Sequence, residues 1–462
     1  MKPEMEQKVL ASLYDRLWQA ITYSPGGGKE ATFDRKTTFV QFSKGEALNP
    51  ADFANAVTPT NPGGNLNAAQ TFSQMVDVIP AVQADYAPSA SKLSDNYEMV
   101  VNGANSSVET DPKQQEIYDK AYEYLNTSTT VKDFTGKEVT THGPSSIHSA
   151  YENNKLTYTA ALSAYRTAYL GYDMSDPKQQ RQFQANAPLL QAAIDKTYNE
   201  WRAAGAAQVE QALAALDTTV NSAVRNVIEA AQRTMRTAAF ESSTGDGTKW
   251  YLSYMLPTNW ADPSGSENFS ALTLKSSFLE TTKDSSFSSY GGGASWFGGL
   301  WGVGGSAAGS SGSTHYHMDA DSLELSAKLG VVRIYRPWLN DLIFKMNKWF
   351  VDNVDKDGIS NGKLQGNESS VIPLIPTAFI VAREIEITAD FTSEDKKHVE
   401  SSVSGSASVG WGPFRISGHY SHSSSKDTFT STFDGGTLKV PGMQIVAWVS
   451  EIVPASPPEN AP

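Results

Sequence analysis

An internal duplication in the C-terminal half constrains the fold more than any other feature of the sequence. Leu272–Phe278 reappears as Ile385–Phe391, a shift of 113 positions from 272 to 385. The same shift aligns further positions without a break: Lys283 with Lys396, Gly292 with Gly405, Gly299 with Gly412 and Gly305 with Gly418. A duplicated unit usually packs against its own copy. We therefore predict two β pseudo-repeats, residues 250–350 and 370–455.

The sequence before the duplication is mostly helical in pattern. Apolar residues spaced three and four apart predict helices over residues 1–25, from about Pro112 to Leu125 and from about Ser146 to Leu170. A further helix of about 50 residues is predicted from Pro188 to Phe240, because no other proline or paired glycine interrupts its apolar stripe. A helix of that length needs partners, so we expect an antiparallel helical stalk.

These patterns together predict an α+β protein. Residues 1–110 form a mixed N-terminal region with the first helix, residues 111–241 form the helical stalk, and the two β pseudo-repeats follow. Three smaller elements are also expected: a strand at Lys36–Phe42, a short helix at Trp338–Val354 and a loose proline-rich tail at Pro454–Pro462.

Composition excludes several classes of function. The net charge is −13 and no basic run is visible, which disfavours nucleic-acid partners. Cysteine is absent, which excludes disulfides, thiolate metal sites and cysteine nucleophiles. The first residues lack an apolar signal core and no apolar run approaches about 20 residues. We therefore expect a soluble protein without a cleaved secretory signal or a transmembrane helix, released or particle-associated.

Two segments, 283–320 and 396–433, are the strongest candidates for a functional element. In the second segment, one predicted strand face carries small and apolar residues and the other carries mainly serines. The first face comprises Val399, Ser401, Val403, Gly405, Ala407, Val409 and Trp411, and the second comprises Glu400, Ser402, Ser404, Ser406 and Ser408. This pattern fits a strand between a core and water. It also fits a barrel wall between lipid and lumen.

Such alternating, Ser/Gly-rich segments resemble the stem hairpins of β-pore-forming toxins. Aromatic residues in or beside them are the predicted membrane or partner contacts: Trp296, Phe297, Trp301, Trp411 and Phe414. In addition, Ser313–Tyr316 resembles the Thr-His-aromatic core of the membrane-attack-complex/perforin signature. That family has a Gly-Gly pair shortly afterwards, whereas the next glycine here is Gly330. The resemblance covers four residues and does not assign the family.

Metal-binding patterns are limited to two short stretches. His315, His317, Asp319 and Asp321 would share one strand face, and His315 with His317 is the pair that could bind a metal ion. A strand rises about 3.3 Å per residue, so all four side chains cannot reach one ion. Asn353–Gly358 begins like a calcium loop, but Leu364 stands where a bidentate glutamate is required. A solvated strand and a polar linker explain both stretches, and no cofactor is predicted.

Catalytic signatures are absent from the sequence. Gly291–Gly293 and Gly304–Gly305 lack the lysine of a phosphate-binding loop, and no serine elbow is found. We therefore expect a non-enzyme. The leading hypothesis is a self-associating, membrane-active protein of the pore-forming kind, with itself and a lipid surface as partners. The alternatives are a structural subunit of a filament, shell or particle, and a carbohydrate- or receptor-binding β-sandwich.

Overall fold

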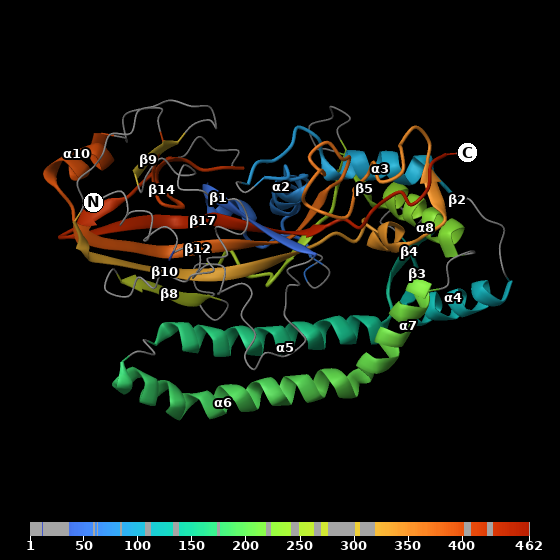
Figure 1. The fold of residues 1–462 in the computed structure, drawn as a ribbon, viewed down its shortest axis with the longest axis horizontal. Helices are drawn as coiled ribbons and strands as arrows, with labels where there is room; N and C mark the ends of the chain where they lie inside the picture. Colours follow the sequence, from blue (N-terminus) through green and yellow to red (C-terminus); the bar gives the residue numbers. More distant parts are fainter. Residues whose placement is uncertain are drawn as a thin grey trace.

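The computed structural model describes Ser12 and residues 37–58, 61, 63–83, 86–106, 112–132, 138–172, 176–218, 223–241, 249–262, 269–275, 301–304, 319–401, 408–422 and 428–461. The predicted first helix over residues 1–25 thus lies outside the described residues except for Ser12. The described chain combines α-helices with a large antiparallel sheet, so the α+β class is confirmed (Figure 1).

The large sheet runs through the middle of the molecule in the order β1–β17–β12–β10–β7, and every pairing is antiparallel. Strand β8 also pairs with β10, and β16 pairs with β17. The bounds are β1 Thr38–Leu48, β7 Tyr254–Leu256, β8 Ser270–Lys275, β10 Asp319–Tyr335, β12 Leu374–Asp390, β16 Thr432–Asp434 and β17 Thr437–Ile452. Residues 38–42 of the strand predicted at 36–42 form the first part of β1.

Apolar residues cover both faces of the central strands. Along β12, Ala378, Ile380 and Ala382 belong to one core, while Phe379 and Val381 belong to a second core on the other face. Helix α2 (Leu66–Val76) and the fully buried Trp260 contribute to the second core. Burial on both faces explains why the first half of β12 reads as an almost continuous apolar run.

The helical part forms a hairpin beside the sheet. Helices α5 (Ser146–Gly171) and α6 (Pro177–Trp201) pack antiparallel, and α5 lies along β8, at the edge opposite β1 (Figure 1). Aromatic rings join the two helices: the ring centroids of Tyr158 and Trp201 are 5.6 Å apart, and those of Tyr165 and Phe183 are also 5.6 Å apart. The predicted stalk is therefore a hairpin that follows the sheet edge.

The prediction of one continuous helix of about 50 residues is wrong, because a turn interrupts it. It begins at Pro177, so Pro188 lies inside α6, where it is exposed. A π-helical turn, Arg202–Ala206, then separates α6 from α7 (Ala207–Thr218), with Gly205 at φ +92°. Helix α8 (Ala223–Ala238) is a separate element that packs on α3 (Leu93–Gly103).

Substitution of Gly205 tests this break, because a broken and a continuous helix predict stability changes of opposite sign. Gly205→Ala should lower the free energy of unfolding by about 1 kcal/mol, because an L-residue with φ near +92° is strained. In an unbroken helix the same change would raise stability by about 1 kcal/mol. Urea unfolding measures the difference, and the exposed Ala192→Gly calibrates the assay because Ala192 lies in the interior of α6. Stabilisation by Gly205→Ala would contradict the break.

Other local predictions are corrected by tertiary contacts. The segment predicted as a helix at Trp338–Val354 forms a short turn, η5 (Asp341–Lys345), and strand β11 (Trp349–Val351). Strand β11 pairs with β2 (Ala104–Ser106), which places Trp349 in the core. The proline-rich tail is not loose: the backbone N–H groups of Asp357 and Ile359 donate to the carbonyls of Pro457 and Ser456.

The remaining described elements are short or peripheral. They are η1 Pro50–Phe53, α4 Pro112–Leu125, β3 Asn126–Lys132, β4 Glu138–Pro144, β5 Ala239–Glu241, β6 Lys249–Tyr251, β9 Trp301–Gly304, α10 Ser393–Ser401, β13 Ser408–Trp411, β14 Phe414–His419 and β15 Thr428–Thr430. Helices α4 and α5 match their predicted bounds to within a residue.

Candidate functional site

Two long connections leave the large sheet at the same end. Excursion 1 (residues 276–318) joins β8 to β10, and excursion 2 (residues 391–436) joins β12 to β17. The register fixes their common origin, because Lys275 faces Glu324, Asp319 faces Asp390 and Thr388 faces Thr437. All four strand ends that carry the excursions therefore meet at one end of the sheet.

Strand β9 of excursion 1 pairs with β13 of excursion 2. A small sheet forms in the order β15–β14–β13–β9, with β9 from excursion 1 and the other strands from excursion 2. In its register Trp301 faces Trp411, and Trp411 faces Phe414. The structure thus brings together, on neighbouring strands, three of the five residues predicted to contact a membrane or partner.

Three apolar side chains of β13 and β14 pack inward. Trp411 and Ile416 are fully buried and Phe414 is 1 % exposed, in one core with Ala447 and Val449 of β17. Trp411 and Phe414 are therefore covered in this conformation, and their contact with lipid stays a prediction. Trp296 and Phe297 lie outside the described residues, as do His315 and His317.

The expected alternation in excursion 2 holds only in part. Residues 393–401 form helix α10 instead of a strand, because Thr392 and Asp395 cap its first turn reciprocally. The side chain of Val399 still enters the core. In β14 Phe414 and Ile416 are buried and His419 is exposed, but Ser417 is buried on the other side of the alternation as well.

One buried glutamine on the large sheet forms hydrogen bonds to the backbone of the small sheet. The Gln444 side chain, on β17, accepts a hydrogen bond from the Arg415 backbone N–H at 2.7 Å and donates one to the Arg415 carbonyl. Gln444 is fully buried. A side-chain amide that satisfies both polar groups of one peptide acts as a substitute for a neighbouring strand.

A bulge in β1 makes room for this contact. The β1–β17 register shifts between Phe42 and Glu46, and Gly45 adopts φ +55° there. A Cβ atom on Gly45 would lie 2.6 Å from the Arg415 nitrogen and 2.6 Å from Oε1 of Gln444. Glycine at this position therefore allows the close approach. No pattern around Gly45, Arg415 or Gln444 in the sequence indicates that they meet.

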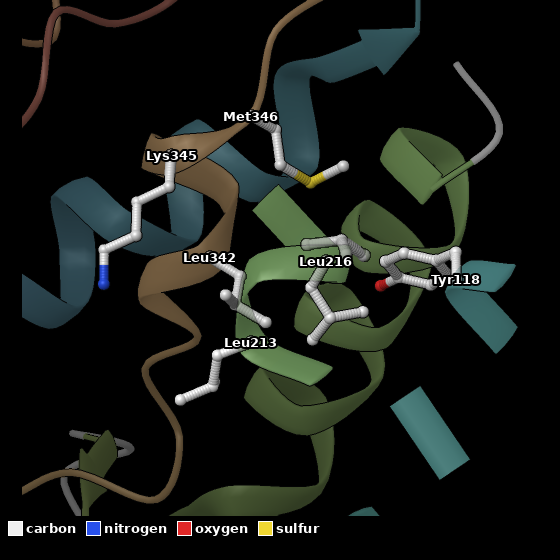
Figure 2. A pocket seen from close by; sticks show the side chains of 7 residues that line it. Tyr118, Leu213, Leu216, Leu342, Lys345 and Met346 are labelled. Atoms are coloured by element: carbon white, nitrogen blue, oxygen red, sulfur yellow. The ribbon is translucent and has the colours of Figure 1, made fainter. Parts of the chain in front are cut away.

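A second candidate site is an apolar cavity of about 420 Å³ among the helices. It lies where α4, α7, α8 and η5 meet, and Figure 2 shows its lining. Its residues are Tyr118, Leu213, Leu216, Val227, Leu342, Lys345 and Met346. Sequence reasoning missed it, because the lining comes from four separate stretches of chain.

A second pocket, of about 260 Å³, is lined mainly by polar residues, among them Asp77. Both oxygens of the Asp77 carboxylate accept hydrogen bonds from Ser94, from its backbone N–H at 2.7 Å and from its hydroxyl at 2.6 Å. Burial raises the pKa of Asp77, while the Ser94 bonds oppose that shift. These contacts assign Asp77 to capping α3.

The described residues contain no group of three or more metal-binding side chains placed to hold one ion. None of the described helices combines the length and apolar character needed to cross a bilayer. Comparisons with protein-family models, curated proteins and solved structures give no match to this chain.

Proposed function

We propose that this protein is a self-associating, membrane-active protein of the pore-forming kind. The observation that carries the proposal is the joint small sheet: both excursions leave one end of the large sheet and pair through Trp301 and Trp411. Each excursion is long enough for two bilayer-spanning strands of about 9–11 residues. In this conformation Trp411, Phe414 and Ile416 are buried against the large sheet.

Membrane entry requires an exchange of apolar environments. Phe414 and Ile416 would leave the core and face lipid, at little net change in apolar burial. Backbone polar groups cannot stay unpaired in a bilayer, so the extended excursions would have to close into a barrel with other copies. Self-association is thus part of the same proposal.

The sequence duplication relates strands on the two sides of the β region, which supports a common origin for the two excursions. A shift of 113 carries Ser270–Lys275 of β8 to 383–388 of β12, and Trp301–Gly304 of β9 to 414–417 of β14. We infer that β7, β8 and β10 form one pseudo-repeat and that β12 and β17 form the other. Both contain an antiparallel pair with one excursion at the same end.

Dye release from liposomes tests the proposal. Purified full-length protein should release calcein in a concentration-dependent way, and negative-stain microscopy should show rings on liposomes only. Intact liposomes at all protein concentrations would refute the proposal. Trp411→Ala is a poor probe, because truncating this buried side chain should cost about 3–5 kcal/mol of stability whatever its role.

The second candidate is a structural subunit of a filament, shell or particle. In such a subunit, exposed apolar side chains of the helices would contact other copies, as Leu189 of α6 (76 % exposed) and Ile117 of α4 (51 % exposed) would. Ordered assemblies that appear without lipid in the same microscopy experiment would support this function and count against pores.

A further inference from the structure

The cavity among α4, α7, α8 and η5 contains one polar group without a partner. Tyr118 is 2 % exposed, and its hydroxyl has no hydrogen-bond partner among the described residues. In Figure 2 the hydroxyl oxygen points toward Leu216, into the cavity. An unpaired buried hydroxyl costs about 1–3 kcal/mol of stability. A ligand that accepts a hydrogen bond from this hydroxyl would remove that cost.

The rest of the lining selects an aliphatic ligand. Leu213, Leu216, Val227, Leu342 and Met346 supply flexible, apolar walls. A volume of about 420 Å³ falls in the range of small-molecule sites and holds on the order of a dozen heavy atoms. Water is a poor occupant, because an ordered water needs about two to four polar partners and these walls offer few.

The charge at the cavity argues for a neutral ligand. Lys345 lies across the cavity from Tyr118 (Figure 2), and its ammonium group is paired with Asp341 at 2.7 Å. Among the described lining residues, no uncompensated cation therefore remains to balance a buried anion. Burial also raises the pKa of the Tyr118 hydroxyl above its usual range, so the hydroxyl stays protonated and acts as a donor.

We propose that this cavity binds a neutral, medium-chain aliphatic molecule with one acceptor oxygen, of the ketone, ester or alcohol class. The aliphatic part of the ligand occupies the space between Leu216 and Met346, and the ligand oxygen accepts a hydrogen bond from the Tyr118 hydroxyl. This site is separate from the small sheet and its ligand does not depend on the membrane proposal.

Isothermal titration of the full chain with 2-octanone tests the proposal. The matched ligand is 2-methyl-1-octene, in which a methylene group replaces the oxygen, and the matched protein is Tyr118→Phe. This variant should fold, because it removes a hydroxyl that has no partner. Tyr118→Phe should weaken the binding of 2-octanone about three- to tenfold. The affinity for the hydrocarbon should stay within about twofold of its value for the unchanged protein.

Octanoate serves as the charged comparison and should bind at least about tenfold more weakly than 2-octanone. Three outcomes would overturn the proposal. They are no saturable binding of 2-octanone, equal affinity of 2-octanone for both proteins, and octanoate binding as tight as that of the ketone.

Discussion

With cysteines at Val303 and Val409, the oxidised protein should release no dye from liposomes, and reduction should restore release. These residues face each other across β9 and β13. Partners in an antiparallel pair have Cα atoms about 4.5–5.5 Å apart, within the range that a disulfide spans. The bond would tie excursion 1 to excursion 2. Because the chain has no cysteine, the introduced pair is the only one that can form.

The control for this cross-link is a second disulfide, placed where excursion 2 leaves the large sheet. Thr388 and Thr437 lie on β12 and β17, and their hydroxyl oxygens are 2.8 Å apart, so the side chains already face each other. Thr388→Cys with Thr437→Cys should cross-link equally well, as mass spectrometry can verify, and should leave dye release unchanged. Full release by the oxidised Val303→Cys/Val409→Cys protein would show that the excursions need not separate.

Replacement of Gln444 by methionine should loosen the small sheet selectively. Gln444→Met keeps the length of the side chain but removes both hydrogen bonds to the Arg415 peptide. The loss of these bonds in a buried position should cost about 2–4 kcal/mol. Amide hydrogen exchange should therefore accelerate in β14 while β12 keeps its protection, and dye release should begin at lower protein concentration.

Gln41 provides a matched control for that substitution. It is also fully buried, and its side-chain nitrogen donates to the carbonyls of Ala81 and Gln83 at 2.8 and 2.7 Å. Gln41→Met removes bonds of the same kind but should leave exchange in β14 and dye release unchanged. Equal effects of both variants on dye release would indicate general destabilisation and remove Gln444 from any role in controlling the small sheet.

Local patterns were sufficient for some elements and insufficient for others. Helices α4 and α5 were predicted almost to the residue, because their apolar spacing and flanking residues act within a few turns. The break at Gly205 was missed because a lone glycine is tolerated inside many helices. In the structure α5 packs against both the π-turn and α7, and such contacts between elements are not visible in the pattern of one segment.

Local sequence patterns were also insufficient to describe the candidate site. The aromatic residues of the excursions were singled out from their pattern, and the structure places Trp301, Trp411 and Phe414 at neighbouring positions. Their pattern did not distinguish a core from a membrane face, because both environments remove the same apolar surface from water. The burial of Trp411 shows that, in this conformation, the environment is a core.

By itself, the sequence determined the α+β class, the two local helices and the absence of disulfides. These depend on composition and on spacing within a single element. Only the tertiary structure decided that Gln444 binds Arg415, that Gly45 admits this contact and that the Tyr118 hydroxyl faces an apolar cavity. Each of these joins residues from different elements. Such contacts follow from how strands and helices pack, which periodicity along one segment does not specify.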